Sequence, residues 1–184
     1  MILTHGANSL SAGSAPITSV TIGGIEYHVI EINGLYWITE NIRNETEHSY
    51  NPPNVTPAKG KLYKARYLTE ITALLSDGWR IPTHNDFLTW SSLSNNSNDY
   101  ISTDLGGNDV YGLNLPLPGY RSTSSSFLYS DTRCLLWSAT EKDDSHNYNV
   151  AFILNSSRDL DDWSAGTSHY EANTALSVRV CKDV

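Results

Sequence analysis

The apolar positions between residues 22 and 38 follow the short alternating pattern of β-strands. Residues 25–32 and 35–38 are rich in β-branched and aromatic side chains. Asn33 and Gly34 lie between these two segments, and Asn-Gly is a strong signal for a two-residue hairpin turn. The pattern predicts an antiparallel hairpin at the start of the folded domain.

The apolar residues between 62 and 75 recur at largely helical spacing, which predicts a first helix. The residues at this spacing are Leu62, Tyr63, Ala65, Leu68, Ile71, Leu74 and Leu75, together with Arg66. Asp77 and Gly78 come directly afterwards and favour the end of a helix.

A second helix is predicted to begin directly after Thr83. Thr83 is a natural N-cap, and Asp86 stands three residues later, where its carboxylate can bond back to the cap. Phe87, Trp90 and Leu93 then share one helical face, and we expect that face to lie on the core.

The second half of the chain alternates polar loops with apolar segments. Residues 94–110 predict a surface loop, and the Pro-rich residues 112–121 predict a buried irregular connector. Strands are predicted over three further segments, 135–139, 148–155 and 176–180, with long polar loops between them. The order of elements indicates an α+β protein with two helices, a small, mostly antiparallel, twisted sheet and long loops.

Length and composition predict one folded domain and exclude some partners. The 184 residues are 39% hydrophobic and 10% aromatic, enough for a real core. Residues 1–20 are rich in Ser, Gly, Ala and Thr, so we expect an N-terminal arm or assembly segment there and a domain over 21–184. The net charge of −8 argues against binding to nucleic acid.

No segment is apolar enough to predict membrane insertion, and the first residues lack the basic start and apolar run of a secretory signal. Synthesis in a cytoplasm is therefore expected. The six histidines show no zinc-like pairing. Asp159, Asp161 and Asp162 lack the spacing of a calcium loop, so we predict a solvated acidic loop, with no metal and no cofactor.

The most polar stretch of the chain, residues 143–149, lies between two apolar strand-like segments. Its Asp, Ser, His, Asn and Tyr codons each lie no more than one base change from the Asn codons AAT and AAC, through their first two adenines. A segment diversified at adenines has this composition. Turn chemistry selects many of the same residues, so an ordinary hairpin loop is the competing interpretation.

The same residue types recur with aromatic side chains up to residue 173. Small polar groups and rigid rings are what binding loops use. Trp163 stands among Asp and Ser and predicts an exposed aromatic anchor, whereas Trp37, Trp79, Trp90 and Trp137 are predicted to lie in the core. The predicted ligand-binding residues are Thr140, Lys142, Asp143, Asp144, Ser145, His146, Asn147, Tyr148, Asn155, Ser157, Asp159, Asp161, Trp163, Ser168, His169, Tyr170 and Asn173.

Four motifs in a fixed order resemble the Fibrobacter succinogenes major paralogous domain. They are GLYWITENIR at 34–43, GWRIPT at 78–83, LPGYR at 117–121, and WSATE at 137–141 with SVR at 177–179. The resemblance covers residues 22–183. The chain departs from the family pattern near its end, where Val180-Cys181-Lys182-Asp183 stands in place of Cys-Val-Lys-Asp.

The resemblance implies a C-type lectin-like fold that displays a ligand-binding surface from its C-terminal strands and loops. Variable proteins of diversity-generating retroelements share this fold, and residues 138–174 correspond to the region that adenine mutagenesis rewrites in them. The implied role is phage tail-tip recognition of a protein or glycan receptor on a cell surface. The protein would be virion-associated or otherwise surface-displayed, and a homotrimer would add avidity.

Two alternatives remain open from the sequence. One is a surface adhesin or glycan-binding lectin-like module without diversification. The other is an oxidase of the formylglycine-generating type, which shares the general fold and needs two cooperating cysteines. Cys134 and Cys181 both lie in predicted strands, where thiols are usually inert, so we expect no enzymatic activity. In the motifs, Glu40, Arg80 and Glu141 are expected to form buried, paired contacts.

Overall fold

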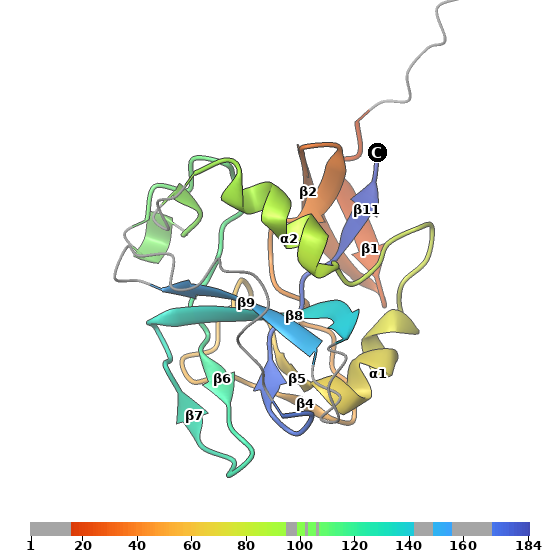
Figure 1. Ribbon diagram of the computed structural model, residues 1–184. Coiled ribbons are helices and arrows are strands. Elements are labelled where there is room, and N and C mark those ends of the chain that lie inside the picture. The colour runs from red at the N-terminus through yellow and green to blue at the C-terminus, as the bar shows by residue number, and fades with distance from the viewer. Residues whose placement is uncertain (1–15, 95–98, 102, 106, 142–148, 156–170) are drawn as a thin grey trace, which may run out of the picture.

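The computed structural model describes residues 16–94, 99–101, 103–105, 107–141, 149–155 and 171–184. Within these ranges the protein has an α+β fold with two short helices and three antiparallel sheets (Figure 1). Among these residues, no helix has the length and apolar character needed to cross a membrane.

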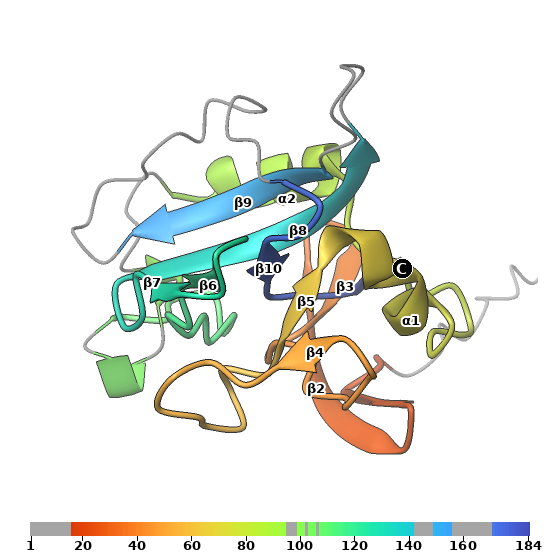
Figure 2. The same ribbon diagram turned by 90° about the horizontal axis from the view of Figure 1, so that it is seen from below.

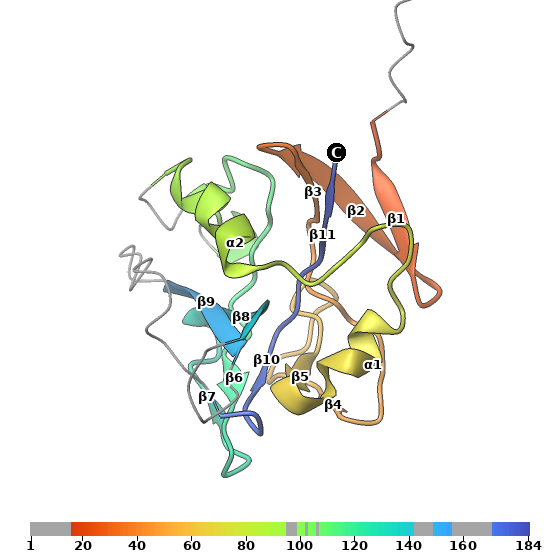
Figure 3. The same ribbon diagram turned by 45° about the vertical axis from the view of Figure 1, so that its right-hand side comes forward.

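The first sheet contains the predicted hairpin and joins the two ends of the domain. Its strand order is β1-β2-β3-β11, with bounds β1 Ser19–Ile22, β2 Ile25–Ile32, β3 Leu35–Ile38 and β11 Cys181–Asp183. Asn33 and Gly34 have φ of 51° and 78°, so the two-residue turn is confirmed. β11 lies beside β3 and pairs with it (Figure 3).

The second sheet is assembled from short strands that are far apart in the chain. Its order is β4-β5-β10-β6-β7, with bounds β4 Ser49–Tyr50, β5 Leu62–Lys64, β10 Ala175–Leu176, β6 Tyr120–Arg121 and β7 Phe127–Leu128. The predicted final strand over 176–180 is therefore wrong in extent. The chain leaves the second sheet after Leu176 and enters the first at Cys181.

The helix predicted over residues 62–75 is wrong in its first half. Residues Leu62–Lys64 form β5, Ala65–Tyr67 form one 3₁₀ turn (η1), and only Leu68–Thr72 form the helix α1. β5 pairs with β4 on one side and β10 on the other. Partners distant in sequence therefore override the local periodicity.

The third sheet is a two-stranded ribbon of β8 (Arg133–Glu141) and β9 (Asn149–Asn155), with an irregular register between Trp137 and Glu141. The helix α2 (His84–Ser91) packs against both strands. Thr83 and Asp86 form the predicted capping box at the start of α2. Figure 2 shows β8 and β9 crossing the molecule as one long ribbon.

Two apolar clusters fill the interior, and the ribbon contributes to both. One includes Trp79 and Trp137, and the other includes Trp37, Phe87 and Trp90. All four tryptophans predicted for the core are buried, which confirms that prediction. His28, on β2, is exposed.

The connector at residues 112–121 is confirmed as buried and irregular up to β6, with Leu113, Leu115 and Leu117 in the second cluster. The prediction of a surface loop over 94–110 is only partly right. Tyr100 and Ile101 are buried in the same cluster, and a 3₁₀ turn (η3) covers Thr103–Leu105. The Tyr100 hydroxyl hydrogen-bonds to the carbonyl oxygens of Trp90 and Ser94. This buried part of the loop therefore packs against the C-terminal end of α2.

Candidate functional site

Three of the predicted ligand-binding residues lie in the described part of the chain. Thr140, near the end of β8, is half-buried, and Asn173, two residues before β10, is exposed. Asn155 is the last residue of β9 and pairs with Arg133. The other fourteen lie outside the described residues: Lys142, Asp143, Asp144, Ser145, His146, Asn147, Tyr148, Ser157, Asp159, Asp161, Trp163, Ser168, His169 and Tyr170.

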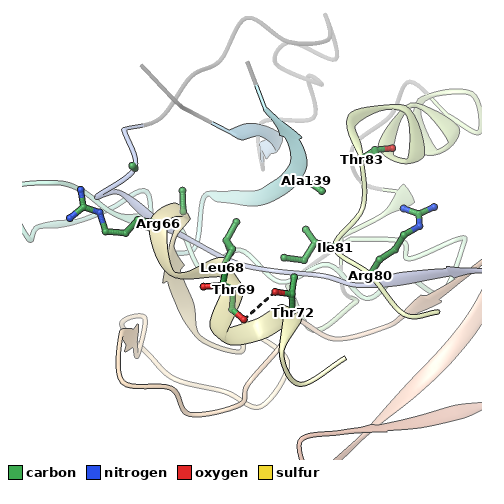
Figure 4. A pocket seen from close by; sticks show the side chains of 10 residues that line it. Arg66, Leu68, Thr69, Thr72, Arg80, Ile81, Thr83 and Ala139 are labelled. Atoms are coloured by element: carbon green, nitrogen blue, oxygen red, sulfur yellow. Dashed lines mark hydrogen bonds between the residues drawn. The ribbon is translucent and has the colours of Figure 1, made fainter. Parts of the chain in front are cut away.

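A cleft of about 820 Å³ opens beside the end of β8 (Figure 4). Its walls come from three parts of the chain: η1 and α1, the segment that leads into α2, and the two ends of the predicted variable region. The described residues that line it are Ala65, Arg66, Leu68, Thr69, Thr72, Arg80, Ile81, Thr83, Ala139 and Ala172.

The centre of the cleft is apolar and its edge is polar. Leu68 and Ile81 are 7% and 5% exposed and form the floor. Thr69 and Thr72 are exposed beside them, and the Thr72 hydroxyl donates to the Thr69 carbonyl at 3.1 Å. This arrangement can bury an apolar group of a ligand and form hydrogen bonds with the polar groups beside it.

The guanidinium groups of Arg66 and Arg80 lie at opposite ends of the cleft and point away from its centre (Figure 4). Arg80 donates to Asp86 Oδ1 at 3.1 Å and to Asp183 Oδ1 at 3.2 Å. The Asp86 hydrogen bonds raise the pKa of Arg80, so its charge is permanent. Arg66 is exposed, with its guanidinium carbon 6.0 Å from the centre of the Tyr67 ring.

Asp86 holds this end of the cleft in place. Burial alone would raise its pKa, but hydrogen bonds from Arg80 and Thr83 outweigh burial and lower it. The carboxylate accepts from both the backbone N–H and the hydroxyl of Thr83, at 2.6 and 2.7 Å. Buried, paired contacts were expected at Glu40, Arg80 and Glu141. Arg80 is paired, but its side chain is about one third exposed, and Glu40 pairs with Arg43. The Glu141 side chain lies outside the described part of the structure.

Backbone hydrogen bonds hold the two segments that border the predicted variable region, residues 138–174. The Ala139 N–H donates to the Pro82 carbonyl at 2.7 Å, and the Arg66 N–H donates to the Ala172 carbonyl at 3.4 Å. Ala139 and Ala172 therefore meet the same cleft from opposite sides, although 33 positions separate them in the numbering of the chain.

Thr140 has a role that the sequence did not indicate. Its hydroxyl accepts a hydrogen bond of 2.9 Å from the backbone N–H of His84, the first residue of α2. A helix leaves its first N–H groups without partners inside the helix. Thr140 thus joins β8 to the start of α2.

The wall formed by η1 and α1 was missed by sequence reasoning. The exposed pair Thr69 and Thr72 has the three-residue spacing that places side chains on one helical face, which was the available signal. Nothing in the sequence places that face beside Ala139, because the contact depends on the pairing of β5 with β10.

The two thiols have the environment of structural cysteines. Cys134 and Cys181 are free and buried, in β8 and β11 respectively. Burial raises the pKa of each thiol to about 12, so both are protonated at neutral pH. Reactive cysteines need the opposite shift. Among the residues that the structure describes, no group of three or more His, Cys, Asp or Glu side chains forms a metal-binding cluster.

Comparison with known proteins gave one match. The model of a family described as the Fibrobacter succinogenes major domain matches residues 30–182. No curated protein and no solved structure matches the chain.

Proposed function

The chain belongs to the Fibrobacter succinogenes major domain family, and from this premise we propose that it is a non-enzymatic ligand-binding module with a C-type lectin-like fold. A hairpin at the start of the domain, two helices and a C-terminal region that returns to pair with the hairpin support the proposed fold. The buried, protonated thiols weigh against the alternative of a cysteine oxidase.

One observation carries the binding proposal. Ala139 and Ala172, at the two ends of the predicted variable region, line the same cleft. In the described frame around them, Arg80, Asp86 and Thr140 are each held by hydrogen bonds within the protein. Side chains placed between residues 139 and 172 would therefore be added to a preorganised site, which lowers the entropy cost of binding.

We propose that this region, about 138–174, is the replaceable part of the surface, as in variable proteins of diversity-generating retroelements. The expected ligand is a protein or glycan receptor on a cell surface. Display on a phage tail tip would fit such a role, with residues 1–20 as an assembly arm and a homotrimer as the assembled form. Several weak sites in one assembly would bind a cell surface by avidity.

Coding DNA tests the diversification. A nearby copy of the segment that encodes residues 138–174 should exist, with differences concentrated at adenines of the copy. If the neighbourhood contains no such copy, the retroelement role is wrong, and a non-diversified adhesin or lectin-like module becomes the better account.

A binding screen tests the cleft. Wild type and Ala139→Arg would be applied to arrays of cell-surface glycans and of purified receptor proteins, with and without EDTA. Ala139 is exposed, so a long side chain there should fill the cleft without unfolding the protein. The matched control is Thr21→Arg, at an exposed position of β1.

We expect ligand signals that persist in EDTA, survive Thr21→Arg and disappear with Ala139→Arg. Equal signals from both variants would contradict a site in the cleft. Glycan signals that require calcium would favour the lectin-like alternative instead.

A further inference from the structure

Two cations and one aromatic ring lie together on the second sheet, outside the cleft. It consists of Tyr50 from β4, Lys64 from β5 and Arg121 from β6, and we name these three residues the basic-aromatic cluster. None of them lines the cleft. Figure 2 shows the sheet that carries the cluster, with β4 and β5 on one side of β10 and β6 and β7 on the other.

The strand register places the two cations on one face. Lys64 pairs with Ala175, and Ala175 pairs with Arg121, so the three residues form one row across neighbouring strands. Residues in such a row project from the same side of a sheet. Two strand spacings put the Cα atoms of Lys64 and Arg121 about 10 Å apart.

Both cations turn toward the same ring. The guanidinium carbon of Arg121 lies 4.2 Å from the centre of the Tyr50 ring, and Lys64 Nζ lies 5.4 Å from it. β5 and β10 separate Tyr50 from Arg121, so this contact passes over the intervening strands. The small side chain at Ala175, which is fully buried, leaves room for it.

These charges have no acidic partner in the described part of the chain. Arg43, Lys59, Lys61 and Arg80 each form ion pairs there, but no described carboxylate lies within 4.0 Å of Lys64 or Arg121. This is notable in a protein of net charge −8. Two like charges on one ring repel each other, and an anion bound between them would remove that repulsion.

The geometry of Arg121 suits an anion. A guanidinium that rests its face on a ring keeps its N–H edge for other partners, and that edge fits a carboxylate or sulfate with two parallel hydrogen bonds. Lys64 adds a second charge beside it. The basic-aromatic cluster can therefore bind acidic groups of an extended ligand.

The neighbouring hairpin adds surfaces that suit sugars. Phe127 pairs with Arg121 in the register and is 41% exposed, and Tyr129 is 48% exposed with Arg133 stacked 4.1 Å from its ring centre. Exposed rings pack against the apolar faces of sugar rings. The turn between β6 and β7, residues 122–126, consists of Ser and Thr, whose hydroxyls both donate and accept hydrogen bonds.

We propose that the basic-aromatic cluster and the adjoining β6–β7 hairpin bind an acidic polysaccharide, with Arg121 and Lys64 on its carboxylate or sulfate groups and Phe127 against a sugar ring. This surface is separate from the cleft. It gives the protein a second binding activity, for an acidic surface polymer, beyond the recognition proposed above.

The test uses the full chain and a defined probe, hexagalacturonate, in calorimetric titrations at low and moderate salt. Lys64→Gln and Lys182→Gln form a matched pair, because each deletes one lysine charge and only Lys64 belongs to the cluster. Arg121→Gln and Phe127→Ala test the guanidinium fork and the exposed ring. Melting curves establish that each variant is folded.

We expect hexagalacturonate to bind and to bind more weakly as salt increases. Lys64→Gln and Arg121→Gln should each weaken binding about tenfold, the scale of one charge-assisted contact, while Lys182→Gln has no effect. If Arg121→Gln does not fold, Lys64→Gln and Phe127→Ala test the proposal, because the Phe127 side chain is exposed and its removal should not unfold the protein.

Three results would overturn the proposal: no binding of hexagalacturonate, equal losses in Lys64→Gln and Lys182→Gln, or equally tight binding of hexathymidylate, which carries a similar charge without acidic sugars. Ala139→Arg separates the two sites. It should leave hexagalacturonate binding intact, and a loss there would place the probe in the cleft and contradict a second surface.

Discussion

Arg179 is a buried charge that donates hydrogen bonds to neutral oxygens. It is fully buried and donates to Asn41 Oδ1 at 2.9 Å and to the carbonyl oxygens of Ile38, Leu113 and Asn114 at 2.9, 2.6 and 3.2 Å. Burial lowers its pKa to about 10, so the charge remains at neutral pH. The side chain thereby ties the end of β3 to the buried connector.

Arg179→Met should be severely destabilising, because it leaves several buried oxygens without donors. Each such group costs about 1–3 kcal/mol, so we expect a loss of at least about 3 kcal/mol in the free energy of unfolding. Urea denaturation measures it. Lys182→Gln, a change at the surface, should stay within about 0.5 kcal/mol. Similar losses in the two variants would contradict this role.

The lowered pKa of Asp86 predicts that the free energy of unfolding decreases at acidic pH. Its pKa in the folded protein lies below its ordinary value of 3.8, so the unfolded chain binds the proton first as pH falls. The stability it contributes is present above pH 3.8 and is lost as pH falls from there through the lower folded pKa. Asp86→Asn should be less stable at neutral pH and should lose less stability on acidification.

Urea titrations between about pH 6 and about pH 2 measure this slope. The matched control is Asp77→Asn, which removes an exposed carboxylate from the turn before Trp79 and should keep the wild-type slope. An unchanged slope in Asp86→Asn would contradict the pairing with Arg80 as the source of acid sensitivity.

At the scale of elements, Gly119 explains why the LPGYR motif has a glycine. Its φ is +68°, and a Cβ there would lie 2.2 Å from the Leu128 carbonyl oxygen, in the strand that pairs with β6. Gly34 has a φ of +78° but no atom within 4 Å of such a Cβ. A substitution at Gly34 therefore measures the cost of backbone strain alone, whereas one at Gly119 measures strain together with a steric clash.

Gly34→Ala should cost about 1 kcal/mol, the strain of a left-handed alanine. Gly119→Ala adds the clash and should cost at least about 2 kcal/mol more, because β6 and β7 must move apart. Urea unfolding of both variants tests this. Equal costs would mean that β7 is not held against Gly119.

Local signals predicted the elements whose determinants are local. Asn33-Gly34 specifies its turn, and Thr83 with Asp86 specifies the start of α2, because each signal acts within four residues. Residues 62–64 follow a helical pattern, yet form a strand, since β4 and β10 supply partners from elsewhere in the chain. The two-residue strands β4, β6, β7 and β10 are too short to leave an alternating pattern.

At the scale of the whole molecule, the sequence located the edge of the candidate site but not its walls. The strand predicted over 135–139 ended at Ala139, and composition marked Thr140 and the polar residues after it as a displayed loop. The cleft exists because α1, the segment before α2 and the return to β10 converge there. That convergence is a property of the assembled sheets, which no local pattern encodes.

The central claim is that a fixed frame carries a replaceable binding surface. It predicts that the proposed ligand-binding residues from Lys142 to Tyr170 can be exchanged with little effect on the stability of the fold. The frame should tolerate far less: Trp137, whose indole N–H donates to the Tyr63 carbonyl at 2.6 Å, joins β8 to β5.

The most direct measurement is the melting temperature of a panel of variants in which these proposed ligand-binding residues are randomised, compared with Trp137→Ala. The account predicts that most of the panel melts within about 2 °C of wild type, as expected for changes near 0.5 kcal/mol, while Trp137→Ala melts more than about 8 °C lower. A panel that loses as much stability as Trp137→Ala would contradict it.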